Sequence, residues 1–176
     1  LLGAFSSAML LYGISLLYGI TGATSYEGIA EALEIRAAGT DPGMIMAIVL
    51  IIAGVGFKVS AVPFHMWAPD AYEGAPLPIT AFLATASKAA GFALIIRIFG
   101  EALFVDGAEW RALIAILAAL TMTAGNLIAI QQVSMTRLIA YSSIGQVGYM
   151  LVVIAAMGFG DSAQAANGSS ALLLHL

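Results

Sequence analysis

Residues 57–88 read FKVSAVPFHMWAPDAYEGAPLPITAFLATASK, a stretch that carries a lysine near each end. Lys58 and Lys88 are thirty residues apart, and each lies in an apolar run long enough to cross a bilayer. A lysine at membrane depth costs about 3 kcal/mol on insertion scales, so such lysines usually serve a function. The residues between them are rich in proline and polar side chains. Proton or ion movement is therefore the first function to consider.

The composition is that of an integral membrane protein. Of the 176 residues, 61% are hydrophobic and 9% are charged, and the mean hydropathy is +1.01. Soluble domains contain roughly 25% charged residues. The net charge of -4 is spread through the loops, which argues against a nucleic-acid partner. The absence of cysteine excludes thiolate-ligated iron–sulfur clusters from this chain.

The hydrophobic pattern predicts an all-α, polytopic bundle of transmembrane helices in a single membrane domain. The expected spans are about 1–23, 44–67, 78–99, 111–130 and 138–159, with the start of a sixth at 171–176. Both ends of the chain lie in apolar runs, so we expect a piece of a longer polytopic protein. Between the first two spans, the spacing of apolar residues predicts a short surface helix, and Asp41 followed by Pro42 is typical of a helix start.

The second span is expected to be broken near Pro63. Proline has no backbone N–H, so the carbonyl of Val59 would lose its helical partner, and lipid offers no substitute. A simple proline kink is the alternative, but the neighbouring Lys58 favours a functional break. The following segment, 68–77, is expected to form a short turn that makes the second and third spans antiparallel neighbours. Trp67 and Tyr72 would then lie at the membrane interface.

Lys88 is the best placed ionisable residue, because about 15 Å of helix separates it from either end of the third span. A structural lysine paired with a buried acid is the alternative explanation. In the next span, Asn126 is expected to be a buried polar group bonded to a neighbouring helix. Gly145 and Gly148 in the fifth span are expected to form a small-residue face for helix packing.

The candidate site consists of Lys58, Lys88 and His65, with a role in proton translocation. Burial disfavours the charged form of a lysine, so such a side chain can take up and release a proton as nearby charges change. Histidine titrates near neutral pH, and a broken helix can admit water between the side chains. The sequence has no dinucleotide, phosphate or haem motif. The same residues would serve a cation antiporter equally well.

Two stretches carry a resemblance to a known family. Residues 56–99, GFKVSAVPFHMWAPDAYEGAPLPITAFLATASKAAGFALIIRIF, and residues 125–151, GNLIAIQQVSMTRLIAYSSIGQVGYML, resemble the antiporter-like membrane subunits of respiratory complex I, the NADH-quinone oxidoreductase. The second stretch departs from the family, which usually has two adjacent basic residues where this chain has Thr136 and Arg137.

The resemblance implies a fold of inverted five-helix repeats with discontinuous helices, of which this chain is a fragment. It places Lys58 beside a helix break, Lys88 on the next helix, and His65 near their polar axis. It also implies that the chain itself binds no cofactor, because NADH, FMN, iron–sulfur clusters and quinone lie on other subunits of the complex. The expected partners are other membrane subunits, including neighbouring antiporter-like ones, and the lipid of the inner (plasma) membrane, which the protein would cross several times.

Three alternatives remain at this point. The chain could belong to a multisubunit sodium/proton antiporter, which shares the lysine pair, or to a related quinone reductase fed by ferredoxin. A purely structural membrane scaffold is the third, and the central lysine argues against it. The segments APLPITAFL and AYSSI favour the NADH-quinone oxidoreductase.

Overall fold

The computed structural model describes residues 2–36, 41–103 and 107–157, and every regular element in these ranges is a helix. The elements are, in order, α1 (Leu2–Thr21), α2 (Tyr26–Arg36), α3 (Pro42–Val59), α4 (Trp67–Gly74), α5 (Leu77–Ala84), α6 (Ala86–Arg97), a short π-helix η2 (Ile98–Ala102), α7 (Gly107–Ile130) and α8 (Met135–Met157). The all-α class is confirmed. The start of a sixth span, expected at 171–176, lies outside the described residues.

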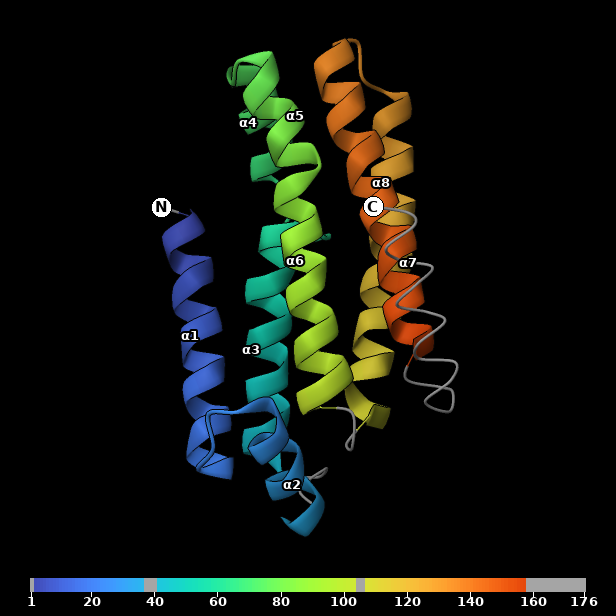
Figure 1. Ribbon diagram of the computed structural model, residues 1–176. Coiled ribbons are helices and arrows are strands. Elements are labelled where there is room, and N and C mark those ends of the chain that lie inside the picture. Colours follow the sequence, from blue (N-terminus) through green and yellow to red (C-terminus); the bar gives the residue numbers. More distant parts are fainter. Residues whose placement is uncertain (1, 37–40, 104–106, 158–176) are drawn as a thin grey trace.

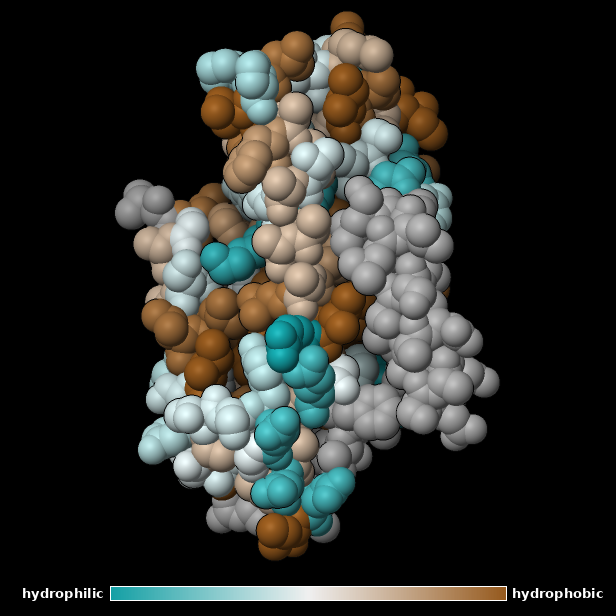
Figure 2. Space-filling model, viewed as in Figure 1, coloured by the Kyte–Doolittle hydropathy of each residue, from teal (hydrophilic) through white to brown (hydrophobic). Residues whose placement is uncertain are grey.

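Five stretches are long and apolar enough to cross a membrane. They are Leu2–Thr21, Pro42–Val59, Leu77–Ala102, Trp110–Ile130 and Met135–Ala156. Figure 1 shows α1, α3 and α6 running side by side, with α7 and α8 as a second group and α2 across the lower end. The closest pairings are α7 with α8 and α1 with α3. The surface in Figure 2 is mostly hydrophobic around the middle, and hydrophilic side chains gather at the lower end.

Helix α3 begins where the sequence predicts. The side chain of Asp41 accepts a hydrogen bond from the Gly43 N–H at 2.9 Å, and Pro42 occupies the first turn, where its missing N–H costs nothing. The expected surface helix is α2. It buries Ile29 and Leu33, four residues apart on one face, and packs against η2.

The second span is interrupted from Ser60 to Met66. The helix ends one residue after Lys58, because Ser60 adopts a left-handed conformation with φ of 64° and ψ of 38°. The Ser60 N–H donates to the Phe57 carbonyl at 3.1 Å, and the Ala61 N–H donates to the Gly56 carbonyl at 2.8 Å. These two bonds form a Schellman cap. Pro63, which follows a cis peptide bond, lies inside the interruption and not at its beginning.

The expectation of a short turn at 68–77 is wrong. Residues Trp67–Gly74 form α4, a second helical piece that follows the interruption. Pro69 is compatible with this helix because it lies in the first turn, where backbone N–H groups have no helical partner in any case. The chain therefore turns back at Ala75 and Pro76, and α4 packs against both α5 and α8.

Side chains from other elements satisfy polar backbone groups at the interruption. The indole N–H of Trp67 donates to the Phe57 carbonyl at 3.0 Å. The Val62 N–H donates to the hydroxyl of Thr121 on α7 at 3.0 Å, and that hydroxyl donates in turn to the Leu117 carbonyl at 2.6 Å. Thr121 is completely buried. Protein groups thus satisfy the Phe57 carbonyl and the Val62 N–H at the interruption, where lipid offers no partner.

Replacing Thr121 with valine should destabilise this region by about 1–3 kcal/mol, because a buried N–H would lose its acceptor at nearly unchanged side-chain volume. The measurement is thermal or denaturant unfolding of the purified full-length protein in detergent. Thr123→Val is the matched control, since Thr123 is exposed on the same helix. Equal destabilisation by the two variants would contradict the assignment.

The third span extends from Leu77 to Ala102 and is irregular in two places. Thr85, with φ of -111° and ψ of -76°, separates α5 from α6, and its hydroxyl donates to the Ala81 carbonyl at 2.8 Å. Such bonding back to the preceding turn often bends helices. The span then ends in the π-helix. Lys88 lies within one turn after Thr85, near the middle of the span.

Helices α7 and α8 approach so closely that their backbones touch. A Cβ built on Gly125 would lie 2.8 Å from the Gly145 nitrogen, and one on Gly148 would lie 2.8 Å from the Met122 nitrogen. The predicted small-residue face is therefore confirmed. Asn126, expected to be buried, is exposed, although its side chain covers Gly145.

Candidate functional site

Lys88 is buried in the interior of the helix bundle, where only 3% of its surface is exposed. It extends from α6 toward α8. Its ammonium nitrogen, Nζ, donates to the Ser143 hydroxyl at 2.7 Å and to the Ser143 carbonyl at 3.1 Å. Nζ also lies 5.8 Å from the centre of the Tyr72 ring, within the range of a cation–π contact. Three elements, α4, α6 and α8, thus meet at this side chain.

The partners of Lys88 are all neutral. Among the described residues, no carboxylate forms an ion pair with it. The alternative of a structural lysine held by a buried acid is therefore not supported in this part of the chain. The ammonium is stabilised by the dipoles of a hydroxyl and a peptide carbonyl and by the quadrupole of an aromatic ring. None of these three groups carries a formal negative charge.

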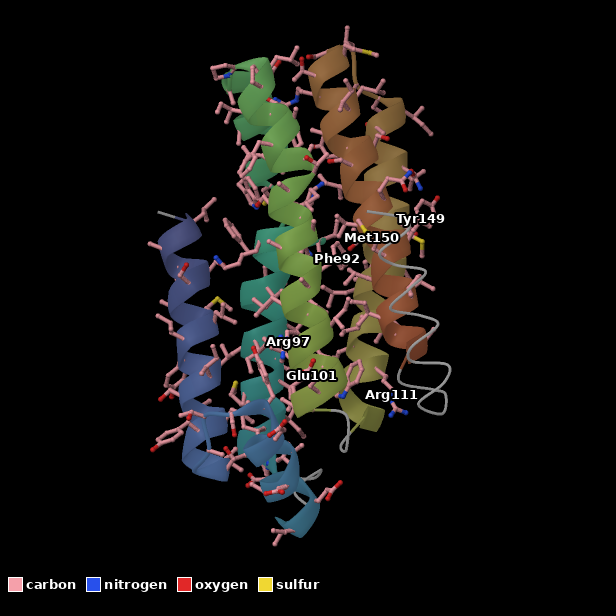
Figure 3. The ribbon with its side chains drawn as sticks, in the orientation of Figure 1. Phe92, Arg97, Glu101, Arg111, Tyr149 and Met150 are labelled. Carbon is pink, nitrogen blue, oxygen red and sulfur yellow. The ribbon has the colours of Figure 1, made fainter. Side chains whose placement is uncertain are left out.

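Apolar side chains close the site on one side along α6. Phe92 lies four residues after Lys88 and therefore on the same face of the helix. It is completely buried, and Figure 3 shows it between α6 and α8 on the same side as Met150, which is also buried. Arg97 and Glu101 follow farther along, toward the lower end, and form an exposed ion pair at 3.1 Å. The interior beside Lys88 is thus apolar on the Phe92 side.

Tyr72 and Ser143 are the site residues that the sequence analysis missed. Tyr72 was expected at the membrane interface, but it is 1% exposed and packs beneath Lys88. The error follows from interpreting 68–77 as a turn. Had that segment been interpreted as a helix, the four-residue spacing of Ala68 and Tyr72 would have placed both on one buried face. No signal in the sequence distinguishes Ser143 from the adjacent Ser142.

Lys58 lies in a different environment. It occupies the last turn of α3, where a cation interacts favourably with the negative end of the helix dipole. Its side chain is exposed in a groove of about 640 Å³ between α1, α3 and α6. Ser6 and Ser7 line the groove from α1, and Ser87 lines it from α6. Figure 2 shows hydrophilic colour within this otherwise hydrophobic gap.

Among the described residues, no series of protein hydrogen bonds joins the two lysines. Lys88 points to α8, whereas Lys58 opens toward α1. His65 lies in the interrupted segment, is half-buried, and meets the ring of Tyr141 edge-on with the centroids 6.2 Å apart. It therefore contacts α8, the helix that also carries Ser143. Of the three predicted site residues, only Lys88 is buried.

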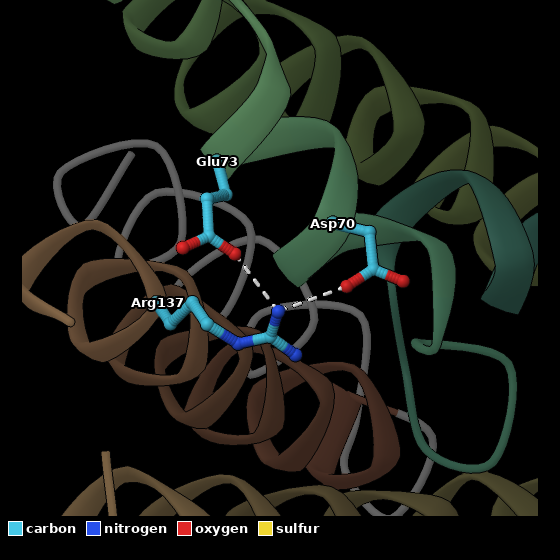
Figure 4. Close-up of polar contacts among 3 residues, drawn as sticks. All are labelled: Asp70, Glu73 and Arg137. Carbon is cyan, nitrogen blue, oxygen red and sulfur yellow. Dashed lines mark hydrogen bonds and ion pairs between the residues drawn. The ribbon is translucent and has the colours of Figure 1, made fainter. Parts of the chain in front are cut away.

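An ion-pair cluster ties α4 to α8 at the upper end (Figure 4). The guanidinium of Arg137 lies 3.1 Å from Asp70 and 2.9 Å from Glu73. The family that the sequence resembles usually has two adjacent basic residues here, and this chain has Thr136 and Arg137. The single arginine in fact bridges both acids.

Replacing Arg137 with glutamine should lower the melting temperature of the full-length protein slightly at low salt. The difference should shrink near 1 M salt, where the Debye length falls to about 3 Å and exposed pairs are screened. In a variant that already carries Asp70→Asn and Glu73→Gln, the same replacement should have no effect. A salt-independent loss would show that Arg137 acts through packing alone.

The described residues contain no group of three or more His, Cys, Asp or Glu side chains that could hold a metal ion.

Residues 1–175 match the family model described as the transmembrane part of NADH:quinone oxidoreductase and Mrp antiporter subunits. The chain belongs to this family. The oxidoreductase/antiporter family includes NADH-quinone oxidoreductase subunit N of Heliobacterium modesticaldum, which is 55% identical over 153 residues, covering 86% of this chain and 31% of the relative. The chain thus spans about a third of the length of such relatives.

Solved structures of the family share the fold. A chain of respiratory complex I from Thermus thermophilus superimposes with a TM-score of 0.70 at 40% identity, covering 89% of this chain and 32% of that one. A chain of the Mrp complex from Dietzia sp. gives a TM-score of 0.76 at 25% identity, covering 88% and 28%. The family resemblance inferred from residues 56–99 and 125–151 is confirmed.

Proposed function

We propose that the full-length protein is a proton-translocating membrane subunit of an NADH-quinone oxidoreductase, and that this chain contains part of its proton pathway. The observation that carries the proposal is the buried ammonium of Lys88, which Ser143 and Tyr72 hold without an acidic partner among the described residues. An ion pair would keep a lysine charged, whereas neutral partners leave both protonation states accessible. The higher identity to complex I subunits than to the Mrp chain supports the same function.

Lys58 and His65 have supporting roles in this proposal. Lys58, at the end of α3 and in the groove beside α1, is a second proton-carrying group. His65, in the interrupted segment and against Tyr141, is suited to exchange protons near neutral pH. The non-helical stretch between them provides backbone groups and space for water that a continuous helix would not.

The redox chemistry takes place elsewhere in the proposed complex. NADH, FMN, iron–sulfur clusters and quinone are bound by other subunits, and the subunit couples quinone reduction to proton movement. Its partners are the other membrane subunits, including neighbouring antiporter-like ones. The five membrane-length helices fit a multi-pass protein of the inner (plasma) membrane. The subunit name of the Heliobacterium relative supports this assignment.

A sodium/proton antiporter subunit is the second candidate. The Mrp chain superimposes slightly better on this chain than the complex I chain does, with TM-scores of 0.76 and 0.70. Because the two kinds of complex share the fold and differ in what drives transport, the driving force is the property to measure.

The test is purification of the tagged full-length protein from its native membrane, followed by transport assays in sealed vesicles. An NADH-quinone oxidoreductase subunit should co-purify with iron–sulfur signals in electron paramagnetic resonance, and NADH oxidation should drive proton uptake without sodium. Proton exchange driven by sodium alone, without iron–sulfur signals, would identify the antiporter. Iron–sulfur signals with proton uptake driven by reduced ferredoxin, and none by NADH, would identify a ferredoxin-fed quinone reductase.

A further inference from the structure

We propose that Ser143 is a positioning residue for Lys88, with a hydroxyl that partners the lysine in both its charged and its neutral form, and that Tyr72 supports it. This inference rests on the proposed proton-translocating function and names further residues that it requires. Ser143 lies on α8 and Tyr72 on α4, so both are far from Lys88 in sequence.

The geometry around the ammonium points to Ser143. At 2.7 Å, the bond from Lys88 Nζ to the Ser143 hydroxyl is as short as charge-assisted hydrogen bonds usually are. The second bond, at 3.1 Å, goes to the carbonyl of the same residue. Ser143 therefore supplies both hydrogen-bond acceptors, and it fixes the position of Nζ on the α8 side of the bundle.

The Ser143 hydroxyl proton points away from Lys88. The hydroxyl donates to the Ala140 carbonyl at 2.8 Å, so that its lone pairs face Lys88. A hydroxyl has one donor and two acceptor sites and can rotate, whereas a carbonyl can only accept. When Lys88 is a neutral amine, its nitrogen has a lone pair, and the hydroxyl can turn from Ala140 to donate to it. The Ser143 carbonyl can accept a hydrogen bond from either form, but it cannot donate to the lone pair of the neutral amine.

The hydroxyl of Tyr72 also lies in this arrangement. It is buried and approaches Ser143, but no hydrogen bond of ordinary geometry is completed. A buried hydroxyl without a partner is unfavourable, and native proteins rarely leave one. If the Ser143 hydroxyl rotates to donate to Lys88, the Tyr72 hydroxyl can donate a hydrogen bond to the Ser143 oxygen. Tyr72 would thus stabilise the arrangement that suits the neutral amine, and it connects Lys88 to the helix after the interruption.

The experiment uses the full-length protein in its assembled complex. Ser143→Ala should lower the rate of NADH-driven proton uptake about tenfold, since a hydrogen bond to a charged group is lost. The rate of NADH oxidation by a soluble acceptor should not change. Ser143→Thr, which restores the hydroxyl, should recover most of the flux.

Tyr72→Phe keeps the ring over Lys88 and should cause a smaller loss. Ser142→Ala is the matched control and should behave as the wild type, because Ser142 is exposed.

Normal flux in Ser143→Ala would overturn the proposal, as would failure of Ser143→Thr to recover or an equal loss in Ser142→Ala. If Ser143→Ala does not assemble, Ser143→Cys is tested in its place, because a thiol fills the same space but forms only weak hydrogen bonds. A loss of flux in Ser143→Cys would support the proposal, and normal flux would reject it.

Lys88→Gln is measured in parallel. If it abolishes flux while Ser143→Ala does not, only the role of Ser143 fails. If it leaves flux intact, the proposed function of Lys88 fails as well.

Discussion

Under the proposed function, replacement of Lys88 by alanine in the full-length protein is expected to lower the rate of NADH-driven proton uptake by at least about tenfold, because a positioned proton-transfer side chain typically contributes about 10²–10⁴ in rate. Coupled quinone reduction should fall with it, since turnover must move protons past this site. Electron transfer from NADH to a soluble acceptor bypasses the membrane subunits and should stay near the wild-type rate. Both rates are measured in sealed vesicles, beside a check that the complex assembles.

Two further substitutions separate charge from proton transfer at this position. Lys88→Arg should recover little flux, because a guanidinium remains protonated in proteins and cannot release its proton. Lys88→Gln can still donate to Ser143 but carries no titratable group, so it should be as defective as alanine. Lys58→Ala should act in the same direction with a smaller effect, because Lys58 is exposed in its groove. Normal pumping by an assembled Lys88→Ala complex would reject the role given to this lysine.

Replacement of Gly125 by leucine is expected to prevent most of the protein from assembling. A side chain at this position would meet backbone atoms of Gly145 at 2.8 and 3.1 Å, and backbone cannot move aside as a flexible side chain can. Overpacking of this kind costs about 1–3 kcal/mol and sometimes more. Helices α7 and α8 would have to separate, which would also shift Ser143 away from Lys88.

The measurement is the amount of assembled complex in membranes, together with its melting temperature. Gly19→Leu is the matched control, since no atom lies within 4 Å of a Cβ at Gly19, and it should assemble normally. The close approach of α7 and α8 would be disproved by a Gly125→Leu complex that assembles and melts like the wild type.

The positions of the main elements follow from local properties that the sequence displays. Hydrophobic length predicts the membrane-length helices, and Asp41 with Pro42 marks the start of α3 because capping involves only neighbouring residues. Lys88 could be selected because its distance from both helix ends is a matter of counting residues. The glycine face of α8 was recognisable because small residues at helical spacing permit close packing.

Three features of the site could not be predicted in this way. Helix α3 ends at Val59 because Ser60 adopts a left-handed conformation. Glycine usually occupies such a cap, so a serine at this position does not signal a helix end in the sequence. The Thr121 hydroxyl accepts a hydrogen bond from the Val62 N–H, 59 positions away in the sequence, and the Ser143 hydroxyl accepts one from Lys88, 55 positions away. Such pairs depend on how helices rotate against one another, which local pattern does not specify.

The sequence by itself determined that this is an all-α membrane protein of the oxidoreductase/antiporter family, with a broken second span and a lysine deep in the third. These properties depend on hydrophobicity, proline chemistry and the spacing of motifs along the linear sequence. Only the tertiary structure decided that Lys88 is held by Ser143 and Tyr72, with no acid among the described residues, that Lys58 faces a separate groove, and that Arg137 joins α4 to α8. The reason is that side-chain partners are selected by the packing of whole helices, and packing joins residues that no local rule connects.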